Sequence, residues 1–433
     1  MKDTIFAKRL ILISAVIAVV FIALFSRAIH LQVISHGELA KLAEKQHLKK
    51  DGAGVDRGVI YDRNMEKIVE DIMAFSIGIE TNKIDESASV AKQLASITGI
   101  NKKLLQDKLS TKKFEWIVRK ADPKINDAIL KANITAVSSF TDSKRYYHYE
   151  TLALPLIGGV GIDSQALGGL ERYYDRYLRV VNNGTVWARD AKGTPIYKMS
   201  AGGGSAGGAK SIVLTIDRRL QQTVEKYLAE ALQNTSAKRG VAIVMDPHTG
   251  EILAFALLPH FISPASGTIS ENYALSEPFD PGSIFKPFLI AGALDAGVVK
   301  PGSKIYCEDG SYRIGNRVIR EGNRKRFGTL TVADIVKHSS NIGCAKIAEK
   351  LGSESFYDYI SKFGFGTVTG IDIPGESRGL LNSPKRWARV DTANIGFGQG
   401  IGVTAIQLVT ALSAIANGGN LVQPHLVKRI IDA

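Results

Sequence analysis

Two residues at a three-residue spacing, Ser283 and Lys286, offer nucleophilic chemistry. A Pro-Gly turn precedes the serine, and apolar residues follow at helical spacing as far as residue 294, which predicts that a helix begins here. Side chains three apart are neighbours on a helix, so the lysine amine can reach the serine hydroxyl. Because a serine hydroxyl is a weak nucleophile until a base takes its proton, the pair predicts Ser283 as the nucleophile and Lys286 as its base.

The lysine needs a lowered pKa for this role. At its reference pKa of roughly 10.4 a lysine amine is neutral in only about one molecule in 2500 at pH 7, and the apolar neighbours of Lys286 favour the burial that would lower it. The alternative is that Ser283 only caps the helix and Lys286 is an ordinary exposed residue. The Ser-x-x-Lys pattern is weak alone, because Ser110 and Lys113 repeat it in a polar segment with no apolar helix behind it.

A second polar turn, Ser339-Ser340-Asn341, begins 56 residues beyond Ser283. The Ser339 hydroxyl could relay a proton between Lys286 and a leaving amine, and the Asn341 amide could hold a substrate carbonyl. A turn that only caps a helix is the alternative, since Ser and Asn dominate such positions.

These residues need a scaffold, and the sequence from residue 211 onward predicts one. A strand over 212–216 is followed by a helix that Asp217 caps and that runs through residue 232. Apolar runs at 241–245 and 252–257 predict a β-hairpin. This order indicates one α+β domain with an antiparallel sheet. Helices are predicted on both sides of the second polar turn, over 332–337 and 344–351.

The segment 35–200 shows no catalytic constellation, so we expect a β-rich, non-catalytic scaffold or docking module there. A polar helical stretch is predicted over 35–50 and a strand with a turn over 56–64. The stretch 83–130 reads as helical except for a strand at 114–119, and a short amphipathic helix is predicted over 168–178. Residues 201–208 are almost all Gly, Ala and Ser, which predicts a flexible linker over 201–210 before a last domain over 211–433.

The amino terminus predicts a membrane anchor. Residues 10–25 are apolar except for Ser14, and a helix extended to residue 34 spans a hydrocarbon core of about 30 Å. A cleavable signal peptide is the alternative, but no small-x-small site follows. Lys8 and Arg9 before the run place a short cytoplasmic tail, residues 1–9, inside and the bulk of the chain outside.

Composition limits the other possibilities. A length of 433 residues suggests two or three domains. The net charge of +13 is spread along the chain without a compact basic block interleaved with aromatics, which disfavours nucleic acid as a partner. Cys307 and Cys344 lack the spacing of a zinc site, and two buried thiols are expected rather than one disulfide.

Taken together, residues 281–287 and the Ser339-Ser340-Asn341 turn make the chain resemble the class B penicillin-binding proteins, the monofunctional peptidoglycan transpeptidases. The resemblance covers nearly the whole chain and is closer to the septal, cell-division branch than to the elongation branch. Further matching segments are 57–64, 169–171, 214–217, 246–254, 370–376 and 396–400.

The resemblance implies a penicillin-binding, serine β-lactamase-like transpeptidase domain, preceded by an elongated pedestal and a single transmembrane helix. It implies that Ser283 attacks the penultimate D-Ala carbonyl of a stem peptide, or a β-lactam ring. Lys286 would be its base, Ser339 a proton relay and Asn341 a substrate anchor. Implied partners are the inner membrane, a polytopic glycan polymerase and other division proteins, with no cofactor and no metal.

The family's third signature, Lys-Ser/Thr-Gly, does not occur after Asn341; His248-Thr249-Gly250 precedes Ser283 and belongs to the predicted hairpin. We therefore expect the sequence to be truncated before that strand, and the truncated chain to be impaired in acylation. Two alternatives stay open: a β-lactam-hydrolysing or β-lactam-sensing serine protein, and a non-catalytic scaffold of the division machinery.

Overall fold

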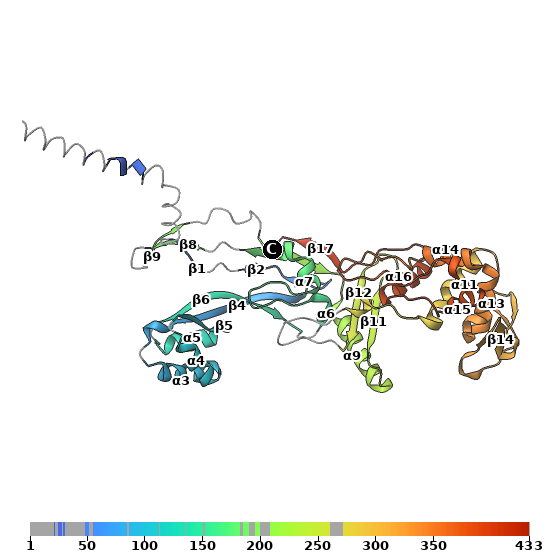
Figure 1. Ribbon diagram of the computed structural model, residues 1–433, viewed down its shortest axis with the longest axis horizontal. Helices are drawn as coiled ribbons and strands as arrows, with labels where there is room; N and C mark the ends of the chain where they lie inside the picture. Colours follow the sequence, from blue (N-terminus) through green and yellow to red (C-terminus); the bar gives the residue numbers. More distant parts are fainter. Residues whose placement is uncertain are drawn as a thin grey trace, which may run out of the picture. The chain divides into compact units, whose positions relative to one another are not determined.

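The computed structural model describes residues 21, 25–27, 29–30, 48–51, 55–84, 86–111, 113–134, 136–149, 152–181, 185–189, 195–199, 208–259 and 272–432 (Figure 1). The chain divides into two compact units. The first comprises Met1–Val55, Met73–Asp142 and Val181–Ala206, and the second comprises Asp56–Ile72, Ser143–Val180 and Gly207–Ala433.

In the first unit, three helices cover one face of a small sheet (Figure 1). Strand β4 (Lys67–Glu80) pairs antiparallel with β5 (Phe114–Ala121) from Phe75 onward and also pairs with β6 (Val137–Tyr147). Apolar side chains of β4 and β5 form a core with those of the helices, and the strand predicted at 114–119 is confirmed. The helices are α3 (Ser87–Thr98), α4 (Lys102–Leu109) and α5 (Pro123–Lys131).

A separate three-stranded sheet orders β1 (Leu48–Asp51), β8 (Thr185–Arg189) and β9 (Pro195–Met199). The prediction of a helix over 35–50 is therefore wrong for residues 48–50, because they pair antiparallel with β8 and this long-range pairing overrides the local polar pattern.

Several sequence predictions fall on residues outside the described part of the chain: most of the anchor over 10–34, the stretch 31–47 and the linker over 201–207. None of the described helices combines the length and the apolar character needed to cross a bilayer.

The second unit contains a sheet in the order β17 (Val427–Ile431), β10 (Ser211–Leu214), β3 (Ile60–Tyr61) and the first residues of β4. Strand β10 is antiparallel to β17 but parallel to β3, so the prediction of a wholly antiparallel sheet is wrong at this pair. The reason is that β3 comes from a segment some 150 residues earlier in the chain, which no local pattern reports.

The predicted helix and hairpin that follow β10 are confirmed. Asp217 accepts hydrogen bonds from the backbone N–H groups of Arg219 and Leu220 and so caps α9 (Arg218–Thr235). Strands β11 (Gly240–Met245) and β12 (Ile252–Leu258) form an antiparallel pair. Their buried residues share a core with β10 and with the end of the chain at Leu426.

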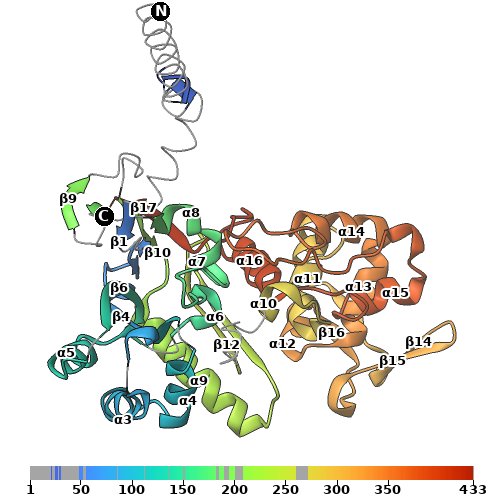
Figure 2. The same cartoon turned by 60° about the vertical axis from the view of Figure 1, so that its left-hand side comes forward.

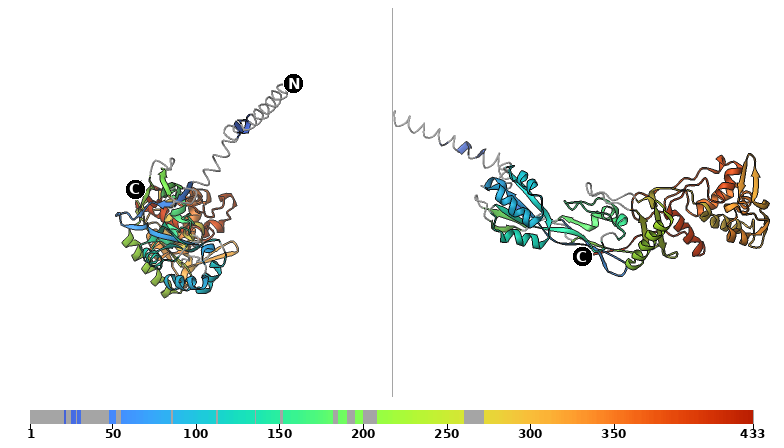
Figure 3. Two further views of the ribbon diagram at one scale, coloured as in Figure 1. Left: turned by 90° about the vertical axis from the view of Figure 1, so that its left-hand side faces the viewer. Right: turned by 90° about the horizontal axis from the view of Figure 1, so that it is seen from below.

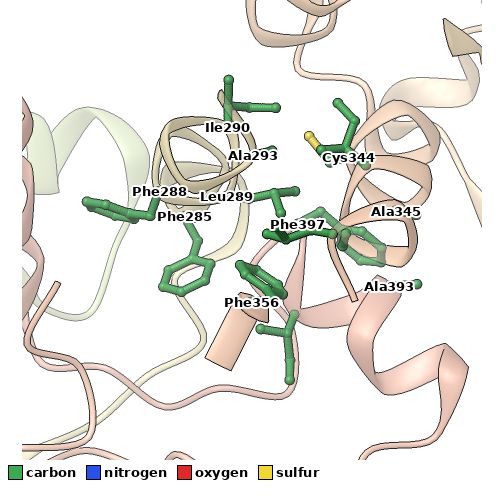
Figure 4. Close-up of a cluster of buried hydrophobic side chains, with 14 of the residues drawn as sticks. Phe285, Phe288, Leu289, Ile290, Ala293, Cys344, Ala345, Phe356, Ala393 and Phe397 are labelled. Atoms are coloured by element: carbon green, nitrogen blue, oxygen red, sulfur yellow. The ribbon is translucent and has the colours of Figure 1, made fainter. Parts of the chain in front are cut away.

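A second core of this unit is helical and surrounds α11 (Lys286–Asp295). Figure 4 shows side chains of α11 and α13 (Asn341–Leu351) facing one another, with Phe356 and Phe397 between them. Phe285 and Phe288 each lie with ring centroids 5.1 Å from Phe365. Each buried phenylalanine contributes about 1.5–3 kcal/mol, so this cluster fixes the amino-terminal end of α11 firmly.

The remaining helices and strands connect these parts. The helix predicted over 168–178 is two short helices, because Tyr174 leaves the helical conformation between them.

In Figure 3, right, the yellow to orange segments from α11 to α15 gather into one body. The bounds are β2 (Val55–Arg57), α6 (Leu154–Ile157), α7 (Gly169–Tyr173), α8 (Asp175–Leu178), β7 (Arg179–Val181), α10 (Tyr273–Ser276), β13 (Lys304–Tyr306), β14 (Ser311–Ile314), β15 (Arg317–Arg320), β16 (Thr329–Thr331), α12 (Val332–His338), α14 (Ser353–Lys362), α15 (Arg389–Ile395) and α16 (Ala405–Ala416).

Candidate functional site

Ser283 lies in a tight 3₁₀ turn, Gly282–Phe285, that leads directly into α11. The serine is exposed, whereas Phe285 at the end of the same turn is fully buried. The turn therefore presents a hydroxyl to solvent on a backbone that the phenylalanine core holds in place.

A glycine loop supports this turn from behind. The N–H of Gly282 donates to the carbonyl oxygen of Gly398 over 2.9 Å, and the N–H of Gly400 donates to the Asp280 carboxylate over 3.1 Å. Gly398 has φ +82°, and a Cβ there would lie 2.0 Å from the carbonyl oxygen of Gly282. Only glycine fits at this position, which makes residues 396–400 part of the support of Ser283.

Lys286 connects the two polar segments that the sequence singled out. Its side chain is buried, and its Nζ donates to the Ser339 carbonyl oxygen over 2.6 Å, to Ser339 Oγ over 2.9 Å and to Asn341 Oδ1 over 2.8 Å. An ammonium group has three donors, so this turn satisfies all of them. The structure thus brings Lys286, Ser339 and Asn341 together, one helical turn from Ser283.

Ser339 adopts a backbone conformation that few serines adopt. It ends α12 in the left-handed region, with φ 55° and ψ 45°. This costs about 1–2 kcal/mol for a residue with a Cβ. The next residue, Ser340, caps α13 by accepting from the N–H of Gly343 over 2.9 Å. The turn is therefore a helix cap, as the alternative interpretation had it, and also a direct contact of the lysine.

The electrostatics of Lys286 suit a base. Burial lowers the pKa of its amine, and the Cys344 thiol and the Glu321 carboxylate oppose that lowering. Burial also raises the pKa of the Cys344 thiol to about 12, so this thiol is uncharged at neutral pH. Glu321 is therefore the negative group that acts on Lys286, and the net effect is a larger neutral fraction of the amine than an exposed lysine has.

Glu321 is a site residue that sequence reasoning missed. Its carboxylate is buried and accepts from Ser340 Oγ over 2.6 Å and from the Asn341 N–H over 2.7 Å, at the amino terminus of α13. The Asn341 side chain also donates to the carbonyl oxygen of Arg320 over 3.0 Å. A single glutamate among arginines has no periodic pattern that would mark it as a site residue. The sequence feature that could have pointed to it is its position between a strand and a Gly-Asn turn.

The competing motifs lie elsewhere. Ser110 ends α4 in the first unit, is exposed, and donates its hydroxyl to the carbonyl oxygen of Asp107. His248 and Thr249 form the exposed turn between β11 and β12. Cys307 and Cys344 are free and buried, as predicted.

The exposed hydroxyl of Ser283, the buried amine of Lys286 and the adjacent hydroxyl of Ser339 are the parts that acyl transfer requires.

The sequence matches two family models. One is described as the penicillin binding protein transpeptidase domain and matches residues 240–432. The other is described as the penicillin-binding protein dimerisation domain and matches residues 53–209.

Curated relatives match over most of the chain. Stage V sporulation protein D of Bacillus subtilis is 30% identical over 435 residues, which are 98% of this chain and 67% of that protein. The probable peptidoglycan D,D-transpeptidase PenA of Neisseria meningitidis is 28% identical, covering 96% of this chain and 72% of PenA. Peptidoglycan D,D-transpeptidase FtsI of Escherichia coli is 29% identical, covering 92% of this chain and 68% of FtsI.

Solved structures are similar as well. A peptidoglycan synthetase from Bifidobacterium adolescentis has a TM-score of 0.66 and 26% identity, covering 89% of this chain and 76% of that chain. A putative peptidoglycan glycosyltransferase from Atopobium parvulum has a TM-score of 0.61 and 25% identity, covering 87% of this chain and 71% of that chain.

Proposed function

The chain belongs to the class B penicillin-binding proteins of the septal type, and from that premise we propose that it is a peptidoglycan D,D-transpeptidase that cross-links stem peptides through a serine acyl-enzyme. The observation that carries the proposal is the set of three hydrogen bonds from Lys286 to the Ser339–Asn341 turn, one helical turn from the exposed Ser283. This geometry supports the roles that we propose for the four residues.

Acylation begins when the neutral amine of Lys286 accepts the proton of Ser283 Oγ. The Oγ then attacks the carbonyl carbon of the penultimate D-Ala and forms a tetrahedral oxyanion. The backbone N–H of Ser283 supplies one donor to this oxyanion, a contribution commonly worth about 3 kcal/mol. The lowered pKa of Lys286 favours the first step, because only the neutral amine accepts a proton.

Collapse of the intermediate releases the terminal D-Ala. Its amine takes a proton from Ser339 Oγ, which recovers one from Lys286 Nζ across the 2.9 Å hydrogen bond. The Asn341 side chain stands at the same turn and orients the substrate amide. An amine of a neighbouring stem peptide then attacks the ester in the reverse sequence, so the new peptide bond forms and Ser283 regains its proton. A β-lactam enters the same path at its strained amide.

Location and partners complete the proposal. In this proposal the apolar run at 10–25, extended to residue 34, anchors the chain in the inner membrane as a single helix, with the amino terminus in the cytoplasm and the bulk of the chain outside. Residues 35–200, most of which match the dimerisation domain, serve as the pedestal and dock division proteins, among them a polytopic glycan polymerase.

A fluorescent penicillin tests the proposal on the full-length protein in membranes. We expect covalent labelling that disappears in Ser283→Ala and in Lys286→Ala but persists in Ser110→Ala, the matched change at the second Ser-x-x-Lys pattern. Labelling of Ser283→Ala would remove the proposed nucleophile. Release of hydrolysed drug over many turnovers would favour the β-lactamase alternative, and absence of any labelling would favour the scaffold.

A further inference from the structure

A strongly basic hairpin lies next to the site. We call β14, β15 and the turn that follows them through residue 326 the basic hairpin; Figure 2 shows its two strands extending from the helical region. Its only acidic residue, Glu321, is buried against α13. Six exposed cations belong to it: Arg313, Arg317, Arg320, Arg324, Lys325 and Arg326.

These cations are not neutralised by the surrounding protein. Within the described part of the chain, no carboxylate lies within ion-pair distance of any of the six. Two neighbouring carboxylates are already paired, Glu308 with Lys346 and Glu349 with Arg389, each over 2.5 Å, and a third, Asp309, accepts from the Tyr306 hydroxyl over 2.5 Å. Unpaired charges of one sign, held together, produce a field that attracts an anionic ligand.

The last part of the basic hairpin, residues 321–326, is held at both ends against the Ser339-Ser340-Asn341 turn. At one end, the Glu321 carboxylate holds Ser340 and Asn341, and at the other end the ring of Phe327 lies 5.5 Å from that of His338, which precedes Ser339. The three cations between these ends, Arg324 to Arg326, therefore border the turn that contacts Lys286.

The turn also has a defined backbone. Asn323 and Arg324 are both left-handed, with φ 55° and 56°. On the other side, a Cβ at Gly310 would lie 2.7 Å from the carbonyl oxygen of Lys325, so the two segments pack closely. Left-handed conformations of residues other than glycine persist where the surrounding structure imposes them, so the backbone that carries the three cations is fixed.

We infer that the basic hairpin binds the free carboxylates of stem peptides. The enzyme should therefore react faster with stem peptides whose glutamyl α-carboxyl is free and charged than with those in which it is amidated. This rests on the proposed function, in which the stem peptide binds at Ser283, next to the Ser339–Asn341 turn to which the hairpin is linked. Stem peptides are the anions that the reaction itself brings to this rim. An exposed ion pair stabilises only weakly, so the one free carboxylate by which the two peptides differ should give a preference of roughly 1.5- to 5-fold.

The test compares two soluble pentapeptides ending in D-Ala-D-Ala that differ only in a free or amidated glutamyl α-carboxyl. The measurement is the second-order rate of acyl-enzyme formation in the full-length protein. We expect the free-carboxyl peptide to react faster at low salt, with the difference shrinking toward 1 M salt, where the Debye length falls from about 10 Å at 0.1 M to about 3 Å.

The variant is Arg324→Glu with Lys325→Glu and Arg326→Glu, for which the preference should vanish or invert. The matched control is Lys102→Glu with Lys103→Glu and Lys131→Glu, which changes the net charge equally on exposed positions of the first unit and should keep the wild-type preference. The amidated peptide gives each variant its own reference rate, and thermal unfolding reports whether the variants fold.

The outcomes separate the two ideas. Failure of penicillin to label the wild-type protein would contradict the proposed function itself. Normal labelling combined with equal rates for the two peptides, with a preference that survives the triple reversal, or with an equal loss in the control, would overturn the inference. Tighter binding of a phosphate-rich teichoic polymer than of the free-carboxyl peptide would assign the surface to that polymer and would also overturn it.

Discussion

The Nζ of Lys286 lies 2.9 Å from the Oγ of Ser339, and the same amine contacts the Ser339 carbonyl oxygen at 2.6 Å. One residue thus offers the lysine both its main chain and its side chain. This double contact depends on the left-handed backbone of Ser339, so the contact with Lys286 and the local backbone strain occur at the same residue.

Two substitutions at Ser339 separate these contributions. Both Ser339→Ala and Ser339→Gly remove the hydroxyl, so we expect both to slow acylation by penicillin by about 10²-fold or more, as loss of a proton-transfer group does. Glycine adopts φ 55° without the Cβ penalty, so the glycine variant should be more stable than the alanine variant by about 1 kcal/mol. Urea unfolding and stopped-flow acylation measure the two quantities. Equal stabilities would show that the left-handed backbone stores no strain.

A second prediction concerns the glycine loop behind the nucleophile. In Gly398→Ala the new Cβ would clash with the Gly282 carbonyl at 2.0 Å and displace Ser283, so we expect acylation to fall by about 10²-fold. Gly418→Ala is the matched control, because Gly418 has nearly the same φ, +85°, but open space around its Cβ. Both variants should lose about 1 kcal/mol of stability from the left-handed backbone, Gly398→Ala should lose more because of the clash, and only Gly398→Ala should lose activity. Equal acylation rates in Gly398→Ala and Gly418→Ala would show that the glycine loop does not position Ser283.

A third prediction tests a buried charge network in the second unit. Arg57 donates to Glu171 over 2.6 Å and to Asp175 over 2.6 Å, and Arg145 donates to Glu171 over 2.7 Å, with Arg57 and Glu171 fully buried. Glu171→Gln removes the one carboxylate that both arginines share and leaves Arg57 with the part-exposed Asp175 and Arg145 with Asp71, so it should lower the free energy of unfolding by about 3 kcal/mol.

The control for that variant is Glu230→Gln, which breaks only the exposed pair with Lys226 and should cost less than about 1 kcal/mol. Thermal or urea unfolding measures both. Similar losses of unfolding free energy in the two variants would show that the buried Arg57 network stabilises the fold no more than an exposed ion pair does.

The sequence predicted the parts of the site that have a local signature. A helix follows the Pro-Gly turn as predicted, but Ser283 lies in a 3₁₀ turn before it and α11 begins only at Lys286; the polar turn at Ser339 lies between two predicted helices. Glu321 and Gly398 were not predicted as site residues, because each acts through a contact between segments distant in the chain. The parallel pairing of β3 with β10 was missed for the same reason.

Glu321 also sets the pH dependence that we expect of the enzyme. Its negative charge favours the ammonium form and so raises the pKa of Lys286 against the stronger effect of burial. The base acts only when neutral, so the acylation rate rises with pH through the pKa of Lys286. Glu321→Gln removes the charge, which should lower the pKa of Lys286 further and move the rising limb of the profile to more acidic pH.

The same change should lower the plateau rate, because Ser340 and the Asn341 N–H lose part of their acceptor and the turn loosens. The pH profile of penicillin acylation gives the pH at which the rate rises and the maximal rate as separate quantities. The control is Glu354→Gln, a substitution at an exposed position of α14, which should alter neither. A lower plateau with an unmoved limb would show that Glu321 only positions the turn. A limb displaced to more alkaline pH would contradict the sign of its action on Lys286.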